Sequence, residues 1–506
     1  MTIEHTKQTV YITASSHAQR TLQDKEASNL NLTDMLAEQI ISAIRKNLNN
    51  RLKDQNPLKI STVVIANQLY FDRLREASEV NQSLGIRGNE PIEDDKIQRI
   101  KLELDNTELF CAAKLNQIAW RVRQKILALT ENNLSIPEET KESLRQAKFI
   151  VTRVKSNGQP AIQEACQYVT ADEAVVFGGG EIMNGFKNPS YSLADTVIPD
   201  SLRSSEESNT MSKVIEGMII NLGRNLNIPD ELLKKHLDYA AAYSRLMAFK
   251  NPQALNPQNK ENEWFDPSDT DQNNFKKILA KIQDDRVMDN HKIFKKSHCC
   301  FNANGAGAII LEDQQTTKHA LKIRGMVTER NIYSIADRYH GVNDGKTIKS
   351  DKTIQIAYNK LKESTDLTND EAHKMAISIH NAFSILVALF LNPLGKIAGD
   401  NLADQMQNFI NMCDKDVTQL EKLRICPLGG LFGGHPSSAT AISMIDQFFG
   451  YYKQQNNAHQ NLTLITSVWG PLEAISLMLL EYCQKTIANS AAANLAIEQE
   501  ELDLVA

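Results

Sequence analysis

The segment Lys148–Gly180, KFIVTRVKSNGQPAIQEACQYVTADEAVVFGGG, has the order of elements that decides the fold. Its β-branched start, Lys148–Val154, predicts a strand that ends at the break Ser156-Asn157-Gly158. A helix is expected over Ala161–Tyr168, and the strand Glu173–Phe177 follows it and ends in a glycine turn. A strand, a glycine-bearing loop, a helix and a second strand are typical of an α/β unit.

The second half of the chain repeats this order. Cys426–Pro436, CPLGGLFGGHP, predicts a glycine-rich loop that opens a helix from about Ser438 to Tyr452. The strand Leu462–Ser467 follows and ends at the turn Trp469-Gly470-Pro471. Two similar α/β halves predict a duplicated αβαβα layered sandwich, with helices outside two sheets and helices between them.

Other segments complete the two halves and add regions around them. A polar, helix-prone insertion is expected at about residues 81–147, and a loop domain at 185–297 separates residues 1–184 from residues 298–488. The end of the chain, 489–506, is Ala-rich and then acidic, which is typical of a solvated appendage. The remaining predicted strands are Val10–Ala14, Ser61–Ala66, Ala306–Leu311 and Leu321–Val327, and the remaining predicted helices start at about Thr33 or cover Met211–Asn225, Asp230–Met247, Asp370–Leu391 and Leu472–Ile487.

Composition argues against several classes of protein. The 506 residues carry a formal net charge of −6, so no domain-wide basic excess is present to bind nucleic acid. The 7 cysteines, an odd number without CxxC spacing, argue against a disulfide framework and against a zinc site. No apolar run reaches the roughly 20 residues that cross a bilayer, and the N-terminus lacks the pattern of a signal peptide. We therefore expect a soluble, cytoplasmic protein without a membrane span, a metal or a nucleic-acid partner.

Segments along most of the chain resemble motifs of the thiolase family, in the family's order and at plausible spacings. The resemblance is strongest to the β-subunits of fatty-acid oxidation complexes, and it is loose before Ala147. It implies a thiolase-like fold with an inserted loop domain, assembled as a homodimer or homotetramer. The matching segments are Val151–Gly158 (VTRVKSNG), Ala174–Glu181 (AVVFGGGE), Met218–Tyr243, Asn304–Glu312 (NGAGAIILE), His380–Ser384 (HNAFS), Gly429–Thr440 (GGLFGGHPSSAT) and Ser467–Ala474 (SVWGPLEA).

The resemblance also places the family's catalytic positions on this sequence. Thiolases acylate a cysteine at a helix N-terminus, where the helix dipole favours the thiolate, and they use a second cysteine to move a proton. Those two positions carry Lys155 and Ser467 here. The family's two histidines are kept as His380 and His435, and Asn381 replaces the acidic residue beside the first of them.

Further positions are implied to contact a coenzyme A thioester, which is the expected substrate class; no cofactor is expected. Ser244 falls at a histidine position of the family's loop domain. Gly305 and Gly434 belong to the two glycine-bearing segments that border the site. Cys426 replaces the asparagine that opens the family's glycine loop.

The replaced cysteines argue against thiolysis. An acylated lysine is an amide, which does not pass its acyl group to coenzyme A at a useful rate, and a serine hydroxyl titrates too far above neutrality to replace a thiol. We expect the nucleophile change alone to remove at least ~10³-fold of the rate. Trp469 stands where the family has small residues, and we predict that its indole fills the substrate tunnel.

Three functions remain open from the sequence. The first is a pseudo-enzyme or non-catalytic subunit, which could pair with a catalytically live partner chain. The second is a divergent acyl-CoA C-acyltransferase or acyl-CoA-processing enzyme that uses His435 and His380. The third is an acyl-CoA binding protein. Plainer interpretations compete at each position. Lys155 can be an exposed polar residue at a helix start, His380 a hydrogen-bonded core histidine on an apolar helix face, and Cys299-Cys300 a pair of buried structural thiols.

Overall fold

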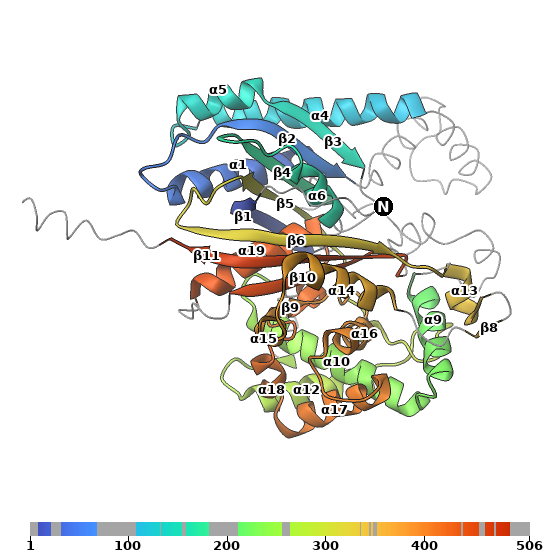
Figure 1. Ribbon diagram of the computed structural model, residues 1–506. Helices are drawn as coiled ribbons and strands as arrows, with labels where there is room; N and C mark the ends of the chain where they lie inside the picture. Colours follow the sequence, from blue (N-terminus) through green and yellow to red (C-terminus); the bar gives the residue numbers. More distant parts are fainter. Residues whose placement is uncertain are drawn as a thin grey trace, which may run out of the picture.

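The structure is a computed structural model (Figure 1). It describes residues 9–21, 32–67, 108–131, 133–153, 158–181, 211–255, 264–333, 335–343, 346–347, 352–436, 439–454, 461–469 and 472–485. Structural statements below concern these residues. None of the helices within this described part is long and apolar enough to span a membrane.

The main sheet has nine strands in the order β3-β2-β4-β5-β1-β6-β11-β10-β9. In its first half, β3 pairs with β2 and β2 with β4 in parallel, whereas β4 with β5 and β5 with β1 are antiparallel. β5 follows the loop domain in sequence and nevertheless completes the sheet of the first half. The bounds of these strands are β1 (Val10–Thr21), β2 (Ile60–Asn67), β3 (Lys148–Arg153), β4 (Ala174–Glu181) and β5 (Ala303–Glu312).

The second half of the sheet repeats this pattern. A single parallel bridge joins Ile377 to Ile425, β9 pairs with β10 in parallel, and β10 with β11 and β11 with β6 are antiparallel. Both halves therefore have the same sequence of two parallel and two antiparallel pairings, which confirms the predicted duplication. The strands are β6 (His319–Arg330), β9 (Ala376–Ser378), β10 (Leu462–Trp469) and β11 (Ala474–Gln484).

A short seam joins the two half-sheets. Only Val10–Ile12 of β1 pairs with Leu321–Ile323 of β6. The halves can therefore turn away from each other along most of their length, which leaves room for helices between them.

Side chains alternate between the two faces of each half-sheet, as the pleat of a strand requires. Val63 and Val176 face the outer helices, whereas Val64 and Val175 belong to a different apolar cluster in the middle of the molecule. In the second half the same middle cluster contains Ile465 of β10, and its neighbour Leu464 faces the opposite side. Each half-sheet is thus buried on both faces.

Two helices form the middle layer, α6 (Gln159–Cys166) and α19 (Thr440–Gln454). α6 contacts β4 of the first half and β11 of the second, and α19 contacts strands of both halves. Helices α1 (Leu32–Asn50), α4 (Glu108–Glu131) and α5 (Glu138–Gln146) cover the outside of the first half, where α4 and α5 fall within the expected insertion (Figure 1). The order of layers is the predicted αβαβα sandwich.

The other outer layer covers the second half and includes helices from the segment that was expected to form a loop domain (Figure 1). α14 packs on β6 and β11, and α10 packs on α12, α16 and α17. The helices of this side are α9 (Met211–Asn225), α10 (Asp230–Lys250), α12 (Asp271–Asp284), α13 (Ile335–His340), α14 (Thr353–Thr365), α15 (Asn369–Lys374), α16 (Ile385–Leu394), α17 (Leu402–Asp416) and α18 (Thr418–Lys422).

Two predicted helices are wrong. The segment expected as a final helix, Leu472–Ile487, contains strand β11. Its first seven residues are all buried and, apart from Ser476, apolar, so they show no strand alternation. The expected long helix Asp370–Leu391 is divided into α15, β9 and α16. His380 therefore lies in the connection between β9 and α16, and not on a helix face.

Several strands are longer than predicted, among them β1 and β4. β1 continues through Ser15 and Ser16, because polar side chains accept hydrogen bonds from their hydroxyl groups. Ser15 Oγ donates to Asp446 at 2.6 Å, and Ser16 Oγ donates to Gln39 at 2.8 Å. β4 includes the glycines expected as a turn. A Cβ on Gly180 would approach Leu32 Cδ1 to 2.9 Å, so glycine allows α1 to pack closely on the strand.

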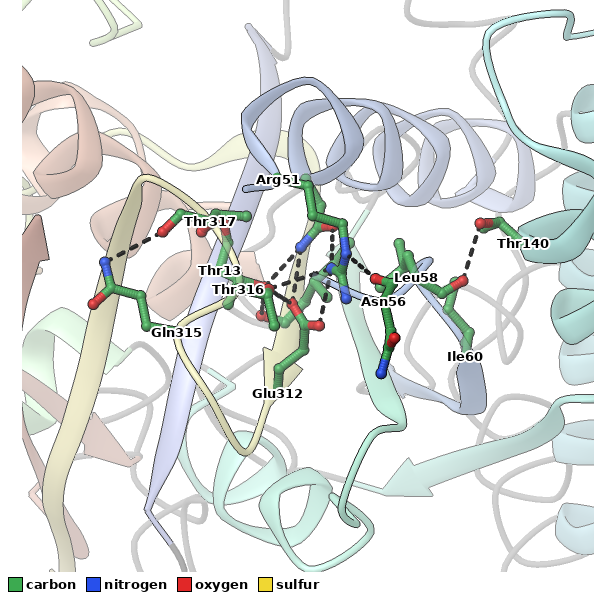
Figure 2. Close-up of polar contacts among 12 residues, drawn as sticks. Thr13, Arg51, Asn56, Leu58, Ile60, Thr140, Glu312, Gln315, Thr316 and Thr317 are labelled. Atoms are coloured by element: carbon green, nitrogen blue, oxygen red, sulfur yellow. Dashed lines mark hydrogen bonds and ion pairs between the residues drawn. The ribbon is translucent and has the colours of Figure 1, made fainter. Parts of the chain in front are cut away.

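A buried polar cluster fastens the end of β5 to α1 and β1 (Figure 2). Glu312 Oε1 accepts from Arg51 Nη1 at 3.0 Å, and Glu312 Oε2 accepts from Thr13 Oγ1 and Thr316 Oγ1, each at 2.6 Å. Asn47 Nδ2 donates to the same Oε2 at 3.0 Å. The carboxylate is thus paired and hydrogen-bonded, the condition under which a charge can be buried.

Candidate functional site

His380 is held at the carboxyl end of β9 beside β10. Its backbone N–H donates to Thr466 Oγ1 at 2.8 Å. Its ring meets the ring of His435 edge to face, with 5.2 Å between centroids and 89° between planes. The structure therefore brings together the two histidines that the sequence places 55 residues apart.

His435 belongs to a loop that is fixed by backbone contacts to the segment before β5. Its N–H donates to Phe301 O at 2.8 Å, and its carbonyl accepts from Ala303 N at 3.1 Å. Its Nδ1 lies 2.8 Å from Thr440 Oγ1, at the first residue of α19. When the threonine hydroxyl donates to Nδ1, the proton of the neutral ring is on Nε2.

Close approaches around this loop explain two glycines. A Cβ on Gly305 would lie 2.5 Å from Pro436 Cβ, so β5 passes directly below the loop. Gly434 has φ +122°, and a Cβ there would collide with the side chain of Gln19. Both glycines border the histidine pair, as expected from the sequence, and their binding of a thioester stays a prediction.

Burial keeps both histidines neutral. It lowers the pKa of His435 to about 4. It also lowers the pKa of His380 well below its usual value, and the neighbouring His435 adds to this effect. At neutral pH the pair therefore supplies two uncharged imidazoles, which can donate a hydrogen bond to a developing oxyanion or accept a proton.

Ser467 and the start of α6 both lie at the part of β10 that bonds His380. Ser467 is 1% exposed and lies one residue beyond Thr466, which bonds His380. Gln159, the first residue of α6, donates from Nε2 to Ile465 O at 2.9 Å, so the N-terminus of α6 lies against the same part of β10. The helix begins at Gln159; Lys155 lies outside the described residues, as does the side chain of Trp469.

Asn381 connects the loops of the site. Its Nδ2 donates to Ser244 Oγ at 3.0 Å and to Gly429 O at 3.2 Å, and its Oδ1 accepts from Leu431 N at 2.6 Å. Asn381 and Ser244 are both fully buried. The observed contact of Ser244 is thus with Asn381, and its role toward coenzyme A stays a prediction.

Three cysteines lie in or beside the loops of the site, and none of them has an accessible thiolate. Cys300 N donates to Ala382 O at 2.9 Å, and the backbone of Cys299 pairs with that of Phe383 in an isolated antiparallel β-bridge. Cys426 is the first residue of the glycine loop. Burial raises the pKa of the Cys299 thiol and of the Cys426 thiol to about 12, and it raises the pKa of Cys300 further. Cys426 is buried, whereas the side chains of Cys299 and Cys300 are partly exposed, so the interpretation of these two as buried structural thiols stays a prediction. Among the described residues, no group of three or more His, Cys, Asp or Glu side chains could hold a metal ion.

A cavity of about 610 Å³ lies on the other face of the second half-sheet. α9, α14 and α16 wall it, together with Leu472 and Ile475. Ile475 pairs with Val468, and both belong to the outer cluster, whereas Ser467 points to the opposite face because residues of a strand alternate. The cavity is therefore separated from Ser467 by the sheet.

Three residues that hold the site were missed from the sequence: Thr440, Thr466 and Gln159. Each acts through a hydrogen bond to a residue that is distant in sequence or lies beyond a turn. Such a hydrogen bond leaves no periodic pattern in the sequence from which it could be predicted. Gln159 alone had a local signal, because it directly follows the break Ser156-Asn157-Gly158.

Comparisons with known proteins agree with the fold. No family model matches the sequence, and no curated protein matches it. Among solved structures, an Ltp2-ChsH2(DUF35) aldolase has a TM-score of 0.55 at 11% identity over 94% of this chain and 99% of the other. Human mitochondrial 3-ketoacyl-CoA thiolase has a TM-score of 0.52 at 13% identity over 94% of this chain and 98% of the other. Fold alone does not carry activity at such identities. The layered architecture, the duplicated strand order and these two structures together assign a thiolase-like fold to this chain.

Proposed function

We propose that this chain is a thiolase-like protein that has lost 3-oxoacyl-CoA thiolysis and acts as a pseudo-enzyme or non-catalytic subunit. The observation that carries the proposal is the state of the thiols beside the histidine pair: Cys299, Cys300 and Cys426 are all desolvated. A thiol with a pKa of about 12 is ionised in only about one molecule in 10⁵ at pH 7, and the thiolate is the attacking form. The sequence resemblance places Lys155 and Ser467 at the positions of the family's two cysteines.

The test is thiolysis of a 3-oxoacyl-CoA by the purified chain, with coenzyme A present and both acyl-CoA products measured by mass spectrometry. Intact-protein mass spectrometry of the same mixture reports whether an acyl group becomes attached. We expect no product above the protein-free background and no mass increase. Turnover that disappears in His435→Ala but persists in His319→Ala would overturn the proposal. His319 is a suitable control because its Nδ1 is bonded to Tyr482 Oη at 2.7 Å, away from the histidine pair.

A second candidate is an acyl-CoA-processing enzyme that never forms an acyl-enzyme. The contact between two neutral imidazoles favours it, since one ring can accept a proton from the carbon beside the thioester carbonyl while the other donates to the enolate oxygen. That a solved aldolase has the same fold also supports non-thiolytic chemistry at such a site.

Solvent exchange tests this second candidate. An acyl-CoA incubated with the chain in D₂O would gain deuterium at the carbon next to the carbonyl, because the proton removed to the imidazole is replaced from solvent. The candidate requires exchange that is lost in both His380→Gln and His435→Gln and kept in His319→Gln. Exchange at the protein-free rate would reject it and leave the non-catalytic role.

A further inference from the structure

A buried guanidinium lies beside the histidine pair, at Arg245 on α10. Arg245 is 8% exposed and is surrounded by three aromatic rings. Its guanidinium carbon lies 4.9 Å from the centroid of Phe301, 5.1 Å from that of Phe432 and 5.8 Å from that of Trp264. Ring faces attract a cation, so these contacts partly replace the water that the charge has lost.

Hydrogen bonding at Arg245 is incomplete. Nη2 donates to Ser297 O at 3.1 Å, whereas the buried Nε has no hydrogen-bond partner. No ion pair joins Arg245 to a carboxylate within the described part of the chain. Burial lowers the pKa of the side chain to about 10, so it stays charged at neutral pH. A buried charge is costly unless an opposite charge and hydrogen bonds satisfy it.

Two of the rings connect Arg245 to the site. The backbone carbonyl of Phe301 accepts a hydrogen bond from the backbone N–H of His435, and Phe432 lies three residues before His435 in the glycine loop. Ser244, the residue before Arg245, bonds Asn381. An anion that reached the guanidinium would therefore be placed next to the loop that carries His435.

We propose that Arg245 binds a carboxylate group of the ligand that occupies the histidine site. The geometry favours a carboxylate because a guanidinium forms in-plane pairs of hydrogen bonds with it, and Nε–H offers an unused donor in that plane. This inference uses the same site as the proposed function but concerns what enters it, so it stands whether or not thiolysis occurs.

The first experiment measures binding to the full chain. Acetate, malonate, succinate, glutarate and inorganic phosphate are titrated separately, with the melting temperature and the fluorescence of Trp264 as readouts. Trp120→Phe and Trp469→Phe are introduced so that Trp264 is the remaining indole. We expect at least one carboxylate to raise the melting temperature in a saturable manner and to change the fluorescence of Trp264. If no carboxylate does so, or if only phosphate does, the proposal is wrong.

Arg245→Met tests the residue itself, because methionine keeps an unbranched apolar side chain and removes the charge. We expect its carboxylate affinity to fall by at least about tenfold, as for the loss of a charged hydrogen bond. Its melting temperature without ligand should be unchanged or higher, since an unpaired buried charge is removed. Unchanged affinity in Arg245→Met would overturn the proposal.

Arg424→Met is the matched control. Arg424 is also buried against aromatic rings and its Nε also has no hydrogen-bond partner, but its guanidinium makes two hydrogen bonds, to Lys374 O at 3.0 Å and to Tyr452 Oη at 3.1 Å. This variant should lose melting temperature and keep carboxylate affinity. The opposite pattern, with Arg245→Met less stable and Arg424→Met deficient in binding, would assign Arg245 a structural role only.

Discussion

Asn381 offers the sharpest test of how the site is held together. Replacement by leucine keeps the branching at Cγ and removes every hydrogen bond that the side chain makes. Leu431 N–H and the carbonyl of Gly429 would then be left without their observed partner. The hydroxyl of Ser244 can turn to a carbonyl of its own helix, as serine commonly does, and adds little.

The magnitude follows from these two groups. A buried donor or acceptor that loses its partner costs about 1–3 kcal/mol, so Asn381→Leu should lower the free energy of unfolding by about 2–6 kcal/mol. Ser244→Ala is the matched control, because it removes one of the three bonds and leaves Gly429 and Leu431 satisfied; about 1 kcal/mol is expected.

Urea unfolding followed by far-ultraviolet circular dichroism measures both variants at pH 7. Imidazole resonances report whether the ring contact between His380 and His435 survives in the folded state, and we expect them to shift in Asn381→Leu and stay in place in Ser244→Ala. Equal unfolding midpoints for Asn381→Leu and the unaltered chain would refute the reasoning, because the site would then not depend on this hub.

Three more perturbations follow from the structure. Arg51→Met should lower the free energy of unfolding by about 3–5 kcal/mol, because it leaves the buried carboxylate of Glu312 without its counter-charge. The double variant Arg51→Met/Glu312→Gln should recover part of this loss in the same urea assay. A double variant no more stable than Arg51→Met would contradict the pairing. Burial lowers the pKa of His236 to about 4, whereas an unfolded histidine titrates near 6.5, so the unfolded state binds more protons between these values. Acidification from pH 7 to pH 4 should therefore lower the free energy of unfolding of the unaltered chain by about 3 kcal/mol more than that of His236→Leu, and equal losses in the two proteins would contradict this reasoning. Gly430→Ala should cost roughly 1 kcal/mol or more, because φ is +58° and a Cβ would lie 2.4 Å from Asn381 Oδ1; an unchanged melting temperature would show that the loop can move aside.

The sequence was sufficient for the layered α/β architecture because its strands and glycine loops recur in the same order in both halves. β2 and β10 lie within a residue or two of their predicted bounds. β11 was missed because a strand buried on both faces has no alternation, so Ala474–Leu480 is equally compatible with a buried helix. The division of 370–391 was missed because β9 is only three residues long.

The candidate site was partly predictable for a similar reason. His380 and His435 could be named from local motifs, and the structure brings their rings together. Their partners Thr440 and Thr466 could not be named, because each contacts its histidine only once the loops and strands of the folded chain come together. The uncompensated charge of Arg245 was also invisible, since burial and pairing are properties of the folded chain.

The position of β5 has a consequence for how this chain is made. A ribosome that has finished β4 at Glu181 must add about 120 further residues before β5 begins at Ala303. At the usual ~5–20 residues per second, this interval lasts roughly 6–24 s. During that time β4 has no partner on one side and β1 has neither of its neighbours, so three strand edges are open to pairing with other nascent chains. Synthesis in the cell should therefore depend on chaperones during this interval, even though the finished protein has both strands in the interior of its sheet.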